Sequence, residues 1–228
     1  MLSPNATAAF FRLEGAIAPV AALEAIGRIA ASAQSVRRRV LGRAMALVGA
    51  GLSLPTPLSD PRAGARLAWS TLEGMSRDRV EVLGLDFARD EILPKVRKEA
   101  RRLLARAKTD GARTVLVSDG LDVVAAEVAR VLGIDEVIAN ALEYDGELAT
   151  GERVVPVVGP ELDPARLASL ARAWGVDLAR SVAYGSCEGD TMLLSQVGRP
   201  CAICPERGLA RVARDLGWPI VLPAGDGA

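Results

Sequence analysis

The polar side chains that could do chemistry in this chain stand in four short segments that follow apolar runs. These segments are residues 12–16, 118–120, 185–190 and 204–207. The first is the most informative, because it places Arg12 directly after the apolar residues 8–11. An arginine stays protonated, so it can bind an anion or pair with a carboxylate, but it cannot act as a nucleophile.

The chain contains no histidine. This excludes histidine general bases, Ser-His-Asp triads and histidine-based metal sites. Its three cysteines include a C-x-x-C spacing, Cys201 and Cys204, which we predict on a buried strand rather than at a helix start, where redox motifs of this spacing lie. We interpret these two and Cys187 as buried thiols; a thiol-based metal or redox site is the alternative.

Composition limits the classes of partner. Lys+Arg and Asp+Glu number 28 each, so no net field favours nucleic acid or anionic membranes. The apolar stretch 44–58 is interrupted by Pro55 and Pro57 and is too short to span a bilayer. No basic region followed by an apolar one opens the chain. We therefore expect a cytoplasmic protein with no nucleic-acid partner and no membrane contact.

Strands and helices alternate from residue 114 onward. We predict strands at 114–117, 136–140, 181–184, 200–204 and 219–222, helices at 122–132, 164–174, 189–197 and 206–216, and a hairpin over 143–148. Alternation of this kind predicts an α/β fold with a parallel sheet covered by helices on both faces. The four polar segments then meet beyond the carboxyl ends of the strands, where such sheets hold their sites.

The chain before residue 90 lacks this alternation. A strand at about 6–11 is followed by a helical pattern from about 18 to 108, which is interrupted by the Gly/Pro-rich segment 49–64. Ser76 is a good N-cap for a helix that begins at Arg77. This pattern indicates helices inserted between the first strand and the rest of the sheet.

We therefore predict an α/β core formed by residues 1–17 and 91–228, and a helical cap formed by residues 18–90. Within the cap, the apolar run 45–54 is predicted to pack one cap helix against another. A surface facing a partner or a membrane is the alternative for that run.

The segments 12–16 and 177–219 together resemble the haloacid-dehalogenase (HAD) superfamily of phosphatases, in its phosphoserine-phosphatase-like branch with a helical cap. The family's opening motif, D-x-D-G-T, reads R-L-E-G-A at residues 12–16. Its closing strand–loop–helix run is matched most specifically at 183–190, 197–200, 204–207 and 216–219. The resemblance implies a Rossmann-like core, with a parallel sheet flanked by helices and an inserted all-helical cap.

In that family an aspartate of the opening motif attacks the phosphoryl group and forms an aspartyl-phosphate. A second aspartate two residues later handles the protons. Arg12 stands at the first of these positions and Glu14 at the second, while Ala16 replaces the threonine of the motif. The resemblance thus implies a missing nucleophile beside a retained carboxylate.

The other motifs of the family are partly kept. Ser118 matches the phosphate-binding serine of the second motif. Alignment on Gly175 places Asp163 where the family has a lysine, which is a reversal of charge. In the fourth motif Ser186 replaces the first metal-binding aspartate, whereas Asp190 remains.

We interpret the chain as a catalytically inactive HAD-like protein, a pseudophosphatase with a binding, scaffold or regulatory role. No cofactor is expected for that role, and the expected partner is a protein bound through the cap or a phosphorylated small molecule. The alternative is a Mg²⁺-dependent phosphomonoester hydrolase with a rearranged site. In that case Glu14, Ser118 and Asp190 carry the chemistry, and Asp190 and Glu188 are the candidate Mg²⁺ ligands.

Three roles are open to the arginine at position 12. It can pair with Asp190, Glu14 or Glu188 and supply the positive charge of the lost metal. It can point to solvent in a decayed pocket. It can also bind a phosphorylated ligand without cleaving it, together with residues 118–120 (Ser118, Asp119 and Gly120) and helix N-terminal amides.

Overall fold

A computed structural model describes residues 6–31, 61–154 and 163–223 of the chain. The apolar run 45–54 and most of the Gly/Pro-rich segment 49–64 lie outside these residues. Among the described residues, no helix has both the length and the apolar character needed to cross a membrane.

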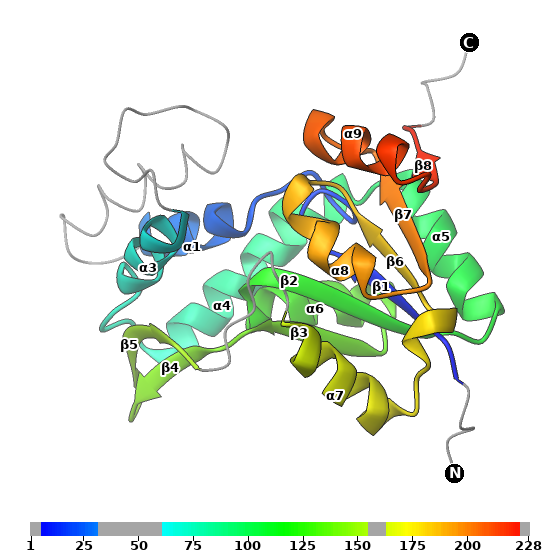
Figure 1. Ribbon diagram of the computed structural model, residues 1–228. Coiled ribbons are helices and arrows are strands. Elements are labelled where there is room, and N and C mark those ends of the chain that lie inside the picture. The colour runs from blue at the N-terminus through cyan, green and yellow to red at the C-terminus, as the bar shows by residue number, and fades with distance from the viewer. Residues whose placement is uncertain (1–5, 32–60, 155–162, 224–228) are drawn as a thin grey trace.

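Six parallel strands form the central sheet, in the order β3-β2-β1-β6-β7-β8 (Figure 1). The strands are β1 (Ala8–Arg12), β2 (Arg113–Leu121), β3 (Glu136–Asn140), β6 (Val182–Gly185), β7 (Arg199–Ile203) and β8 (Ile220–Val221). Every residue of β1 is buried, as expected for a central strand of a parallel sheet that is covered on both faces. The predicted fold class is therefore confirmed.

The two faces of the sheet pack against different helices. Phe11 and Leu116 share one core with α5 (Lys98–Thr109) and α6 (Asp122–Leu132). Phe10 and Val115 share a second core with α7 (Pro164–Trp174), α8 (Thr191–Ser195) and α9 (Arg207–Asp215). Because neighbouring strand residues point to opposite faces, Phe10 and Phe11 tie β1 into both cores.

Helices occupy the described chain between β1 and α5. They are α1 (Ala22–Ala31), α3 (Pro61–Ser70) and α4 (Arg77–Phe87), followed by a π-helical turn at Ala88–Ile92 and a 3-10 turn at Leu93–Lys95. Ser76 is the N-cap residue of α4 and has the extended backbone expected there, although its hydroxyl makes no capping bond.

A hairpin of β4 (Leu142–Asp145) and β5 (Leu148–Arg153) lies against these helices, as Figure 1 shows. The link between α3 and α4 is bonded to it: the Gly74 amide donates to the Ala149 carbonyl, the Ala149 amide to Met75, and the Arg77 amide to Glu147. The hairpin was predicted; its attachment to the inserted helices was not.

Most element boundaries agree with the sequence-based expectation, and two differ near the site. The strand predicted at 114–117 continues through residues 118–120 to Leu121, because pairing with β3 resumes at Asn140 after a register shift. The helix predicted at 189–197 is shorter: a 3-10 turn (Glu188–Asp190) precedes α8, which ends at Ser195.

Candidate functional site

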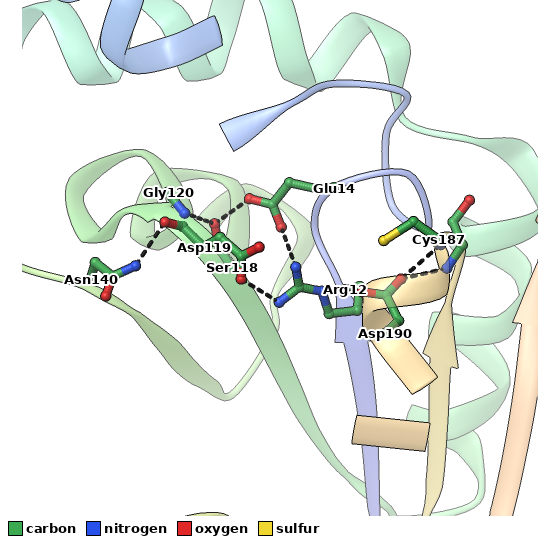
Figure 2. Close-up of polar contacts among 9 residues, drawn as sticks. Arg12, Glu14, Ser118, Asp119, Gly120, Asn140, Cys187 and Asp190 are labelled. Atoms are coloured by element: carbon green, nitrogen blue, oxygen red, sulfur yellow. Dashed lines mark hydrogen bonds and ion pairs between the residues drawn. The ribbon is translucent and has the colours of Figure 1, made fainter. Parts of the chain in front are cut away.

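Arg12 ends β1 at the centre of the sheet and is 2% exposed. Figure 2 shows its guanidinium between Asp190 on one side and Glu14 and Asp119 on the other. Arg12 Nε lies 2.8 Å from Asp190 Oδ1, one terminal nitrogen donates to Asp119 Oδ1 at 2.9 Å, and the other lies 3.5 Å from Glu14 Oε2. All three nitrogens of the guanidinium thus face a carboxylate.

Two opposing effects act on the pKa of Arg12. Burial lowers it, but the combined attraction of Glu14, Asp119 and Asp190 is stronger and raises it above the ordinary arginine value. The guanidinium is therefore a permanent positive charge at the position where the resemblance implies a nucleophile.

Asp190 is fully buried; one of its carboxylate oxygens accepts hydrogen bonds, and the other is in an ion pair with Arg12 that does not meet hydrogen-bond geometry. Oδ2 accepts from the backbone amides of Ser186 at 2.7 Å and Cys187 at 3.0 Å, while Oδ1 faces Arg12. The carboxylate has this position because Gly185 lacks a side chain: a Cβ there would lie 2.6 Å from the Asp190 Cβ.

Glu14 and Ser118 form the other half of the site. The Ser118 hydroxyl donates to Glu14 Oε1 at 2.6 Å and accepts from the Gly120 amide at 3.0 Å. Burial raises the pKa of Glu14, although the charge of Arg12 opposes this shift. The Ser118 hydroxyl and the Gly120 amide are therefore bonded within the protein rather than directed at a ligand.

Two residues outside the predicted site hold the backbone of these segments: Asn140 at the end of β3 and Arg97, the N-cap residue of α5. Asn140 Nδ2 donates to the Asp119 carbonyl at 2.7 Å, and Arg97 Nε donates to the Gly15 carbonyl at 2.7 Å. Gly15 has φ +78°, and a Cβ on it would lie 2.7 Å from the Ser186 Cβ, so only glycine fits this turn. Neither Asn140 nor Arg97 was predicted; the only signal for Asn140 is that it ends the strand next to β2.

A cavity of about 680 Å³ opens beside Arg12. Its charged lining consists of two arginines and four carboxylates: Arg12, Arg97, Glu14, Glu24, Asp119 and Glu206. The excess of negative charge disfavours a phosphorylated ligand, because Arg12 is already paired and the remaining carboxylates repel an anion.

The structure separates the two predicted metal candidates. The Glu188 side chain is 64% exposed and lies 4.0 Å from Arg211, whereas Asp190 is fully buried. Of the three roles left open for Arg12, the structure shows the ion-paired one, with Asp190 and Glu14, and not the solvent-facing one. Glu188 is not among the ion-pair partners of Arg12, whereas Asp119, which was not expected, is one. Within the described part of the chain, no group of three or more Cys, Asp or Glu side chains is placed to hold a metal ion.

Asp163, aligned with the family's lysine, is the N-cap of α7, and its Oδ1 accepts from the Ala165 amide at 2.9 Å. An aspartate at this position thus has a local role in starting the helix. It does not line the cavity beside Arg12.

The three cysteines are free thiols. Cys201 is buried in β7 as predicted, whereas Cys187 and Cys204 are half-buried and line the cavity beside Arg12. Cys204 lies just past the end of β7 with φ +44°. Burial raises the pKa of both Cys187 and Cys201 to about 11, so both thiols stay protonated at neutral pH.

Comparison with known proteins identifies relatives over most of the chain. Residues 9–195 match the family described as haloacid dehalogenase-like hydrolase. The "Inhibition of morphological differentiation protein" of Streptomyces azureus is 34% identical over 149 residues, which are 65% of this chain and 53% of that protein. "Phosphoserine phosphatase SerB1" of Mycobacterium tuberculosis is 29% identical over 214 residues, which are 93% of this chain and 70% of that protein.

Solved structures share the fold at lower identity. A protein of unknown function from Bordetella pertussis Tohama I superposes with a TM-score of 0.79 at 22% identity, and the match covers 95% of this chain and 98% of that one. An apo phosphoserine phosphatase superposes with a TM-score of 0.64 at 19% identity, covering 96% and 94%.

Proposed function

The chain belongs to the haloacid dehalogenase-like hydrolase family, and we propose that it is a member without phosphatase activity that has a binding or regulatory role. The observation that carries this proposal is the ion-paired Arg12 at the position of the attacking aspartate. A guanidinium has no nucleophilic lone pair at neutral pH, so an aspartyl-phosphate cannot form there.

The rest of the site supports the same proposal. A phosphoryl group bound at this edge would need free hydrogen-bond donors, but Ser118 donates to Glu14 and Arg12 is surrounded by carboxylates. Asp119 and Glu14 add negative charge beside the cavity. Of the two expected ligand classes, these charges favour a protein partner over a phosphorylated small molecule.

We propose that such a partner binds through the helical cap predicted at residues 18–90, of which the structure describes α1, α3 and α4. In this proposal the predicted core, residues 1–17 and 91–228, supplies a stable fold and the cap supplies the contact surface. Loops and inserts on a rigid scaffold commonly carry binding functions in this way.

A second candidate is a Mg²⁺-dependent phosphomonoester hydrolase with a rearranged site. It is favoured by the names of several relatives, among them "Phosphoserine phosphatase SerB1" and "Probable phosphatase Rv3661" of Mycobacterium tuberculosis. These names support hydrolysis more directly than they support an inactive protein. In this candidate Glu14, whose pKa is raised, would hold the proton for a leaving group.

Release of inorganic phosphate separates the two candidates. The purified chain would be incubated with p-nitrophenyl phosphate and with phosphoserine, each with and without Mg²⁺. We expect no release above the blank. Phosphate release that disappears in both Glu14→Gln and Asp190→Asn would overturn the proposal and establish the second candidate, since a contaminating phosphatase would be insensitive to these substitutions.

A further inference from the structure

Mg²⁺ is the cofactor that this family implies, and the residues present do not fit it. Mg²⁺ requires oxygen ligands in near-octahedral geometry. Both oxygens of Asp190 already contact the amides of Ser186 and Cys187 or the guanidinium of Arg12. The Ser186 hydroxyl donates to the Cys204 carbonyl at 3.1 Å, so it too is engaged elsewhere.

We propose that the guanidinium of Arg12 takes the place of a divalent cation within the chain itself, so that the native protein binds none at this site. This inference deepens the proposed function and rests on its assignment of Arg12 to the nucleophile position. It concerns the binding of a divalent cation and not of a substrate, and it applies to the protein without a bound ligand.

Geometry and charge carry the inference. Glu14, Asp119 and Asp190 come from three different segments of the chain, and each directs one carboxylate oxygen at a different nitrogen of the guanidinium. Carboxylates gathered this closely repel one another unless a cation lies between them. Here that cation is covalently part of β1 and cannot dissociate.

With Arg12 in place, the three carboxylates are not arranged to hold a metal ion among the described residues, but their oxygens are of the kind that divalent cations bind. If Arg12 is shortened to alanine, the side chain that separates them is removed and their charges are left without compensation. A hydrated divalent cation offers the charge and the oxygen preference needed to fill that space. The Arg12→Ala variant should therefore gain a dependence on divalent cations that the native protein lacks.

Thermal unfolding in EDTA and in MgCl₂, together with Mn²⁺ binding followed by electron paramagnetic resonance, tests this directly. We expect the native protein to leave all Mn²⁺ free and to show the same Tm in both buffers. Arg12→Ala should bind one Mn²⁺, and its Tm should rise by roughly 5 °C or more in near-saturating Mg²⁺. Arg12→Lys keeps a positive charge at this position and should stay insensitive to the ion.

Two further variants control for indirect effects. Arg28→Ala removes an arginine from the exposed pair with Glu91 and should show no response to Mg²⁺. Asp190→Asn added to Arg12→Ala should abolish the response, because it removes a ligand of the new site. A response in Arg28→Ala as strong as that in Arg12→Ala would overturn the inference.

The native protein alone can also refute the inference, even if Arg12→Ala folds poorly. Stoichiometric Mn²⁺ binding by the native chain that is lost in Asp190→Asn would overturn it. So would a folded Arg12→Ala that binds no ion, or an unfolded one that Mg²⁺ does not restore. If the native protein binds the ion but releases no phosphate, this inference is refuted and the proposed function stands. If the native protein releases phosphate without a metal ion, the proposed function is refuted and this inference stands.

Discussion

The Nε atom of Arg12 lies 2.8 Å from Oδ1 of Asp190, and the two side chains are 2% and 0% exposed. A charge removed from water to this extent depends on its partner, because the protein interior screens poorly and offers no replacement solvation. The pair joins the end of β1 to the 3-10 turn that follows the neighbouring strand β6. Loss of this ion pair should therefore destabilise the whole fold.

Replacing Arg12 by methionine should lower the free energy of unfolding by about 3–5 kcal/mol, because it leaves Asp190 buried without its counter-charge. The change is measured by urea denaturation at pH 7 in EDTA. Arg28→Ala, which breaks the exposed pair with Glu91, should cost at most about 1 kcal/mol. Similar losses of unfolding free energy in the two variants would contradict the argument that burial makes the Arg12–Asp190 pair more important for stability.

Arg12→Asp by itself should not produce phosphatase activity. It restores the side chain that the family uses as nucleophile, but Asp163 and Ser186 still stand where the family has a lysine and a metal-binding aspartate. It also adds a further carboxylate beside Glu14 and Asp119. The three carboxylates repel one another, and they repel a phosphate as well. Phosphate release from p-nitrophenyl phosphate is the measurement, with circular dichroism to confirm folding; turnover by this single variant would show that Arg12 alone blocks the reaction.

Ser118→Ala should reduce the free energy of unfolding by about 1–3 kcal/mol. It removes the hydrogen bond to Glu14 and leaves the Gly120 amide without its acceptor in a buried place. Ser70→Ala is the matched control, since the exposed Ser70 hydroxyl donates to the Leu67 carbonyl of its own helix α3. If both variants unfold at the same urea concentration, the Ser118–Glu14 bond contributes nothing measurable.

Gly185→Ala should displace the carboxylate that pairs with Arg12. The added Cβ would lie 2.6 Å from the Cβ of Asp190, a distance that neither backbone can tolerate without moving. We expect a loss of stability of about 1–3 kcal/mol or more, as for other overpacked sites. Thermal unfolding of this variant beside the native protein measures the loss, and an unchanged Tm would show that Asp190 does not depend on the missing side chain at Gly185.

Acid should destabilise the native protein in part through Glu127. Hydrogen bonds from Arg130 and Arg89 lower the pKa of this buried carboxyl from 4.5 to about 2. Because the folded pKa lies below the unfolded one, its contribution is fully present above pH 4.5 and is lost as the pH falls towards 2. Glu127→Gln should therefore be less stable at pH 7 and lose less stability across that range.

Glu147→Gln at the exposed tip of the hairpin provides the comparison for Glu127→Gln. Its acid-unfolding profile should follow that of the native protein. An unchanged profile in Glu127→Gln as well would mean that the two arginines do not favour the charged form of Glu127.

The alternation of strands and helices after residue 114 was sufficient to predict the sheet, because short apolar runs that alternate with longer amphipathic segments are typical of buried parallel strands joined by helices. It also predicted that residues 12–16 and 185–190 would meet, since the carboxyl ends of parallel strands share one edge. The same rule brings residues 118–120 to this edge, but it left open whether Arg12 would pair with a carboxylate, point to solvent or bind a ligand. The ion pairs of Arg12 with Asp190 and Asp119 are findings of the structure.

Glu188 shows where sequence reasoning was insufficient. It stands two residues before Asp190, and a strand or an open loop could direct both carboxylates into the site. The segment instead forms a 3-10 turn with three residues per turn, which directs neighbours two apart to different sides. Glu188 therefore faces α9 and Arg211, while Asp190 faces Arg12.

The bonds that join residues 74–77 to residues 147–149 have a mechanical consequence. The α3–α4 link is hydrogen-bonded to β5, with an isolated antiparallel bridge between Ser76 and Leu148. These bonds join the hairpin to the inserted helices, although the two are about seventy residues apart in the chain. A swing of α3 and α4 away from the sheet must either break these bonds or carry the hairpin along. The amides of Gly74, Arg77 and Ala149 should thus exchange with solvent deuterium as one cooperative group, and any hinge for the inserted helices has to include the connections of β4 and β5 to the core.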